Sequence, residues 1–159
     1  MNYHPLPQPE EIPVREREDA MGAYLMMFAS IGAGLPLPII NLIAAIIYFF
    51  VNKKKSRFVH FHALQSLLSQ LPTSLINAGG VFWAVRIFFF HWEFSDAFKG
   101  YLIMAAAANL IYFIFSIIAA VQARKGRMYY LIFFGRISYE YAYRVREEST
   151  EKAQNLPPK

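Results

Sequence analysis

Two histidines separated by one residue, His60 and His62, come nearest in this sequence to the type and spacing of a metal site. A helix turns by about 100° per residue, so the two side chains would point about 200° apart and could not bind one ion without another element. The chain has no cysteine, and its other histidines are His4 and His91. We therefore expect no metal and no other cofactor, and interpret the pair as interfacial histidines beside a basic cluster.

Catalytic motifs are also missing from the sequence. The long apolar runs contain no acidic residue, neither GxSxG nor HExxH occurs, and GAG at 32–34 lacks the pattern of a phosphate-binding loop. The absence of cysteine excludes thiol catalysis, thiolate metal sites and disulfides. We expect a protein that is not an enzyme.

Uncharged polar side chains form the clearest pattern in the chain. On a helix over residues 58–86 they would fall within an arc of about 140°, and a second polar arc of about 100° would lie on residues 99–123, among alanines. The stripe consists of His62, Gln65, Ser66, Ser69, Gln70, Thr73 and Asn77, answered by Asn109, Tyr112 and Ser116. We favour a hydrogen-bonded interface between helices, at about 0.6–2 kcal/mol per bond, while a water-filled pathway lined by the same groups stays open.

Long apolar helices must position these side chains. Residues 20–51, 58–85 and 100–123 contain no Asp, Glu, Lys or Arg. At about 1.5 Å per residue, each run is long enough to cross a hydrocarbon core of about 30 Å. The sequence therefore predicts an all-α integral membrane bundle of about four transmembrane helices.

The first apolar run is too long for one crossing, because it would form a helix of about 48 Å. Its middle holds the sequence GAGLPLP, with Gly32, Gly34, Pro36 and Pro38. Glycine and proline at this density break a helix. We expect two short pieces, which could be two crossings or a re-entrant hairpin shielded by neighbouring helices.

Two basic clusters, KKKSR at 53–57 and ARKGR at 123–127, border the apolar runs. The positive-inside rule places both on the cytoplasmic side, with Trp92 in the aromatic connection FFFHWEF on the opposite side. The expected basic surface consists of Lys53, Lys54, Lys55, Arg57, Arg124, Lys125, Arg127 and Arg136. Because these charges flank apolar runs, anionic lipid headgroups explain the net charge of +5 better than nucleic acid does. Other membrane proteins or further copies of the chain are the remaining partners that we expect.

The polar ends divide the chain further. Residues 1–19, with four prolines, predict a flexible tail without a signal peptide, which ends where Asp19 can cap the bundle of residues 20–127. Residues 128–146 combine tyrosine and arginine and predict a segment at the headgroup level, either helical or extended. The polar residues 147–159 predict a disordered tail.

The block SRFVHFHALQSLLSQL at 56–71, after an LPLP-containing apolar run, resembles the small membrane subunit family of the chloroplast inner-envelope protein-import (Tic) translocon and its bacterial relatives of unknown function. The A-x-x-G-R-x-Y block from Ala123 to Tyr129 and Ile137-Ser138-Tyr139 extend this resemblance. It implies a four-helix bundle with both termini cytoplasmic, and for plastid members a part in protein transport. The short N-terminus without a transit peptide favours a bacterial relative.

Two classes of function remain open from the sequence. The first is a non-enzymatic subunit or scaffold of a membrane complex in the bacterial inner membrane, with the C-terminus cytoplasmic. The resemblance implies that this complex is translocon-like. The alternative is a homo-oligomeric channel or small transporter. No charged residue lies within the apolar runs, and intramembrane charges usually mark ion pathways, so the first class is favoured.

Overall fold

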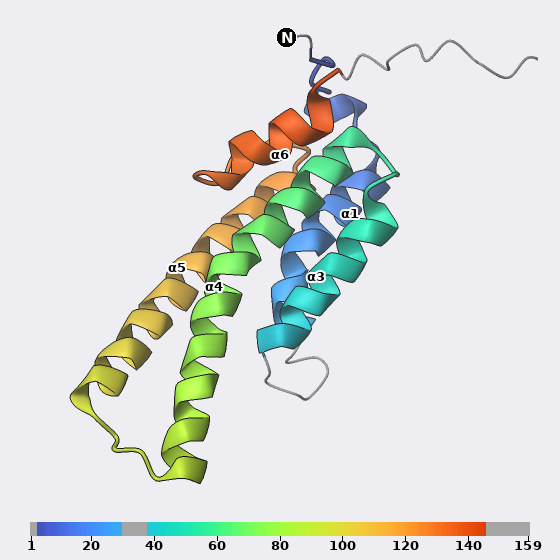
Figure 1. Cartoon of the computed structure of the whole chain (residues 1–159). Helices are drawn as coiled ribbons and strands as arrows, with labels where there is room; N and C mark the ends of the chain where they lie inside the picture. The colour runs from blue at the N-terminus through green and yellow to red at the C-terminus, as the bar shows by residue number, and fades with distance from the viewer. Residues whose placement is uncertain (1–2, 30–37, 146–159) are drawn as a thin grey trace, which may run out of the picture.

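The computed structural model describes residues 3–29 and 38–145, and the regular secondary structure of this part of the chain is helical, with one isolated bridge between Tyr3 and Arg144 (Figure 1). The five α-helices are α1 (Val14–Leu25), α3 (Pro38–Asn52), α4 (Arg57–Phe90), α5 (Asp96–Arg124) and α6 (Phe134–Tyr143). Two short 3-10 helices are η1 (Pro9–Glu11) and η2 (Met26–Phe28). The expected all-α class is confirmed for the described residues.

Helices α4 and α5 form the long hairpin of the molecule. They contain 34 and 29 residues, which correspond to lengths of about 51 Å and 44 Å. Each begins at a serine whose hydroxyl accepts a hydrogen bond from a backbone amide of the first turn: Ser56 from Val59 and Ser95 from Phe98. Only these two helices of the described chain are long and apolar enough to cross a membrane, so four crossings are not established.

The surface of this hairpin is apolar. None of the most apolar stretch of α4, and 11% of that of α5, is buried inside the protein. Large apolar side chains such as Leu75, Phe82 and Ile103 are 73%, 61% and 72% exposed. A soluble protein would cover helices of this kind, whereas lipid tails solvate them without cost. The chain is therefore a membrane protein.

Residues 20–51 contain two separate helical pieces on one side of α4 (Figure 1). Helix α1 and η2 lead into the bundle, and α3 returns beside them. Of the residues expected to break the run, Pro38 is the first residue of α3, where proline costs no backbone hydrogen bond. Gly32, Gly34 and Pro36 lie outside the described residues.

The boundary of the expected N-terminal tail needs correction. Helix α1 begins at Val14 with Pro13 as its N-cap residue, so Asp19 lies within the helix and does not cap it. Proline before the first turn and the charged sequence VRERED, which suits a solvated helix face, explain this earlier start. The residues just before α1 also contact the helix, since Arg17 donates a hydrogen bond of 2.8 Å from Nε to the carbonyl of Ile12.

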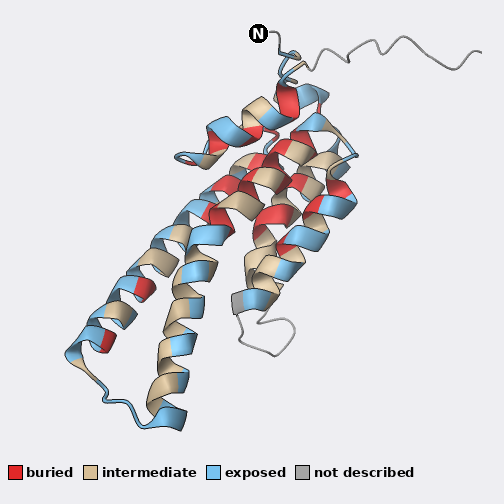
Figure 2. Cartoon of the chain, viewed as in Figure 1, coloured by how far each residue is buried: buried red, intermediate tan, exposed pale blue. Residues whose placement is uncertain are grey.

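The buried core lies at the end of the bundle where α1, α4, α5 and α6 meet (Figure 2). Its largest cluster joins Ala20 and Tyr24 of α1 to Phe58 of α4, with Ala119 and Ala123 of α5 against them. The small face of α5 therefore packs against α1 at this end, although the sequence pattern suggested α4 as its partner. Towards the other end of the hairpin, exposed and partly buried residues predominate (Figure 2).

Candidate functional site: a buried polar network and a basic end

Gln65 is the centre of a buried hydrogen-bond network. Its side chain is 0% exposed, and its amide nitrogen donates to the Tyr24 hydroxyl at 2.7 Å and to the Tyr129 carbonyl at 2.8 Å. Its amide oxygen accepts a hydrogen bond of 3.1 Å from the backbone amide of Leu131. One side chain of α4 therefore connects α1 with the segment between α5 and α6.

Two neighbours extend this network along α4. The Nδ1 atom of His62 lies 2.9 Å from the hydroxyl of Tyr24, and both side chains are almost fully buried. The Ser66 hydroxyl donates to the carbonyl of Ala23 at 2.8 Å. Since buried polar groups in a bilayer find no water, these bonds favour one position of α1 on α4.

The expected face-to-face arrangement of the two polar stripes is therefore only partly present. His62, Gln65 and Ser66 bond to α1 and the segment after α5, because α1 covers this part of α4. The Ser69 and Thr73 hydroxyls donate to carbonyls of their own helix, at 2.9 Å and 3.0 Å. These two residues do not bridge helices.

One pair does join α4 and α5 as the stripes suggested. Asn77 and Asn109 exchange two amide hydrogen bonds, of 2.9 Å and 2.7 Å, and the Asn109 amide also donates to the carbonyl of Ala105. Nearby, the Tyr101 hydroxyl donates to the carbonyl of Ile76 at 2.6 Å. These contacts link the two helices in a region with few buried side chains.

We expect a double-mutant cycle on Asn77 and Asn109 to show a coupling free energy of about 1 kcal/mol, because two reciprocal bonds disappear when either residue becomes leucine. The measurement is unfolding of Asn77→Leu, Asn109→Leu and the double variant in lipid bicelles. Additive losses would show that the pair does not hold the hairpin together.

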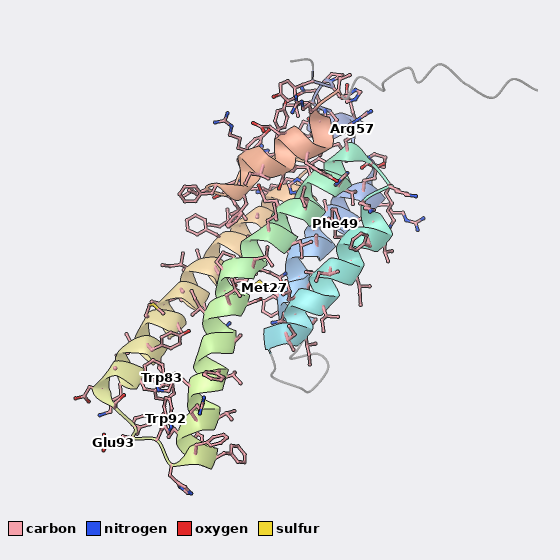
Figure 3. The ribbon with its side chains drawn as sticks, in the orientation of Figure 1. Met27, Phe49, Arg57, Trp83, Trp92 and Glu93 are labelled. Atoms are coloured by element: carbon pink, nitrogen blue, oxygen red, sulfur yellow. The ribbon has the colours of Figure 1, made fainter. Side chains whose placement is uncertain are left out.

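A polar cavity of about 210 Å³ lies beside this pair, among η2, α3, α4 and α5. Its polar lining comes from Asn41, Gln70, Thr73, Ser74, Asn77, Asn109 and Tyr112, with Met27, Phe28 and Phe113 as apolar walls. Figure 3 shows Met27 pointing towards α4. Gln70 is 2% exposed, and neither atom of its side-chain amide has a hydrogen-bond partner in the described structure. The Tyr112 hydroxyl lies near Gln70 and Ser116, without a hydrogen bond of good geometry.

Both basic clusters lie at one end of the bundle, together with the acidic first turns of α1. Lys55 forms an ion pair of 2.7 Å with Asp19, and Arg124 one of 3.0 Å with Glu18. Figure 3 shows Arg57 at this end and Trp92 with Glu93 at the opposite end of the hairpin. The acids of α1 therefore neutralise part of the predicted basic surface.

The other cations of this surface differ in their surroundings. Lys53 lies over the ring of Phe50, with Nζ 4.3 Å from its centroid. Arg136 is on α6 and pairs with Glu140 at 3.0 Å, one helical turn further on. The exposed members at the two loops are Lys54, Arg57, Lys125 and Arg127.

Helix α6 packs on α4 (Figure 1), and its first turn closely approaches the segment before it and the Gln65 side chain. A Cβ atom at Gly135 would lie 2.8 Å from Tyr130 Cα and 2.9 Å from Gln65 Oε1. Tyr143 is 1% exposed, and this burial raises the pKa of its hydroxyl above the usual value. Within the predicted headgroup segment, Phe134–Tyr143 is thus a helix with one buried face, which is the helical alternative left open by the sequence.

Sequence reasoning missed Tyr24 and Glu18, and it assigned Asp19 to a helix cap and missed its ion pair with Lys55. Tyr24 carries the only hydroxyl between Ala20 and Ala29, and this isolated polar group in an apolar run was the available signal. The acids gave no signal, because their partners are distant in sequence and depend on how α1 packs. Among residues 3–29 and 38–145, no group of three or more histidines or acids is placed to hold a metal ion.

Comparison with known proteins gives one result. No curated protein and no solved structure matches the chain. The model of the MamF/MmsF family, described as the magnetosome magnetite crystal formation protein family, matches residues 16–138. The resemblance to the Tic translocon subunit family was wrong, because the family model that matches is that of MamF/MmsF. The match covers most of the chain, which therefore belongs to the MamF/MmsF family of magnetosome magnetite crystal formation proteins.

Proposed function

We propose that this chain is a non-catalytic protein of the magnetosome membrane that acts in magnetite crystal formation as a subunit or scaffold of a membrane complex. The family match is the observation that carries the proposal. The network around Gln65 supports a structural role, because its polar groups bond to one another and hold three segments together. The expectation of protein transport is given up with the resemblance on which it rested.

Deletion of the gene in a magnetosome-forming bacterium tests this role. We expect smaller or irregular magnetite crystals in electron micrographs, restored by the parent chain, and a fluorescent fusion that follows the magnetosomes. Unchanged crystals together with a fusion confined to the plasma membrane would contradict the proposal. Catalytic turnover of an iron compound by the purified chain would remove its non-catalytic part.

The orientation that we propose places the basic end of the bundle in the cytoplasm. Both clusters and the ion-paired turns of α1 lie at that end, and the positive-inside rule favours it. Helix α3, at 15 residues, spans about 22 Å, which is less than a hydrocarbon core of about 30 Å. We therefore propose that α1 and α3 form a re-entrant hairpin and that α4 and α5 cross.

Single cysteines can test this orientation, because the chain has none of its own. On isolated intact magnetosomes, we expect an impermeant thiol reagent to label Lys54→Cys and Lys125→Cys, and to label Glu93→Cys only after permeabilisation. Ala33→Cys should stay unlabelled in both conditions. Labelling of Ala33→Cys that appears on permeabilisation would show two further crossings, and labelling of Glu93→Cys on intact magnetosomes would invert the topology.

A second candidate function is a homo-oligomeric channel or small transporter. The cavity beside Gln70 favours it, since unpartnered amide atoms in a bilayer suit water or a small neutral solute. Flux of water and of small polar solutes into proteoliposomes tests this candidate. Flux that falls in Gln70→Leu while the fold is retained would replace the scaffold proposal.

A further inference from the structure

The basic end of the bundle contains a hollow of about 670 Å³ where three distant segments converge. Lys53 and Lys54 come from the loop after α3, Arg57 from the first turn of α4, and Arg144 from the end of α6. His4 joins them because its backbone amide donates to the carbonyl of Tyr143 at 2.8 Å. Three of these four cations come from the KKKSR cluster, and the tertiary fold brings Arg144 and His4 beside them.

The four cations around this hollow are among those of the described chain that form no ion pair. Lys55, Arg124, Arg136 and Lys99 each pair with a carboxylate. By contrast, Lys53, Lys54, Arg57 and Arg144 form no ion pair with any described carboxylate, and no acidic side chain lines their hollow. Glu11 and Glu16 border a neighbouring hollow that Arg57 also lines, but neither pairs with it.

Four like charges around one hollow repel one another, and an anion there would remove this repulsion. The start of α4 adds the positive end of its helix dipole at Arg57. A phosphate group suits this site, since it carries several acceptor oxygens and arginine binds it with paired N–H groups.

The surroundings of Lys53 indicate where such a phosphate comes from. Lys53 lies over Phe50, which is 59% exposed and continues an apolar stripe of α3 with Ile43 and Ile47, at 47% and 58% exposed. These three residues share one helix face, which leads from the hollow towards the middle of the bilayer. An exposed apolar face of α3, on which acyl chains can lie, therefore begins beside Lys53.

We propose that this hollow binds the phosphate of an anionic membrane lipid, whose acyl chains lie along the exposed face of α3. This site goes beyond the role in crystal formation and would stand if that role failed. It requires only that the basic end lies at a membrane surface.

Native mass spectrometry of the full chain in detergent tests the site, with added phosphatidylglycerol or phosphatidylcholine. We expect the parent to retain phosphatidylglycerol selectively, and Lys53→Gln with Lys54→Gln to weaken this binding about tenfold. Arg144→Gln, on another segment, should weaken it as well. The matched control, Lys55→Gln with Arg124→Gln, removes the same charge at the same end from cations that are already paired, and should change binding less than about threefold.

Three outcomes would overturn the proposal. Equal losses in the control and the test variants would show a diffuse surface charge and no site. Inorganic phosphate that displaces the lipid at equal concentration would show that the acyl chains contribute nothing. If lipid bound only after Glu147, Glu148 and Glu151 were all changed to glutamine, the chain's own acidic residues would be the occupant of the hollow.

Discussion

Gln65→Leu is expected to lower the free energy of unfolding in bicelles by about 2–3 kcal/mol. Leucine fills most of the same volume, but it leaves the Tyr129 carbonyl and the Leu131 amide without their buried partner. Each unpaired backbone group costs about 1–3 kcal/mol, reduced in a bilayer because the unfolded chain also finds partners there. The expected loss therefore exceeds that of a single interhelical bond.

Gln70→Leu is the matched control, with the same substitution on the same helix. Gln70 is as deeply buried as Gln65, yet its amide has no partner in the described structure. We expect Gln70→Leu to be neutral or stabilising, because leucine removes an unsatisfied amide from an apolar environment. Equal losses in the two variants would show that volume, and not hydrogen bonding, determines the effect.

The class of fold could be predicted from the sequence, because the sequence patterns that indicate membrane helices are local. Charge-free runs with basic borders indicate membrane helices wherever they pack, and the GAGLPLP sequence marks the interruption between α1 and α3. The polar stripe on α4 also includes side chains that the structure buries, namely His62, Gln65 and Ser66. Periodicity alone determines which side chains share a face.

The partners of that face could not be predicted from the same pattern. A stripe shows which side of α4 is polar, but α1 and α5 both offer small residues to it, as Ala23 and Ala105 illustrate. Tyr24 decides in favour of α1 at one end, and Asn109 in favour of α5 further along. The roles of the stripe and of the basic surface in the cell remain predictions.

The translocon resemblance failed for a related reason. Its most specific element, FHALQ, contains the residues that dock α1, α6 and the segment between α5 and α6 on α4. Such a motif encodes how helices pack, and helix packing can serve unrelated functions. It therefore carried information on architecture and none on protein transport.

Gly135→Val is expected to release α6 from α4, the second large effect. A Cβ atom at position 135 would lie 2.7 Å from Tyr130 Cβ and 2.8 Å from Tyr130 Cα. Backbone atoms cannot move aside as a flexible side chain would, so the helix must shift. Because Gln65 Oε1 lies 2.9 Å from the same point, the shift also strains the central network. We expect a loss of about 2–4 kcal/mol, in the range of severe overpacking.

Trypsin measures this release directly. In the parent, the bond after Arg136 lies within α6, whose buried face holds the helix against α4, whereas the variant should be cleaved there much faster. Gly100→Ala is the control, because a Cβ atom at position 100 meets nothing within 4 Å. A helical alanine should stabilise α5 by about 0.5–1 kcal/mol and leave this cleavage unchanged. Cleavage after Arg136 at the parental rate in a folded Gly135→Val protein would show that α6 does not depend on the close approach at Gly135, and that its other contacts, including buried Tyr143, are enough to hold it.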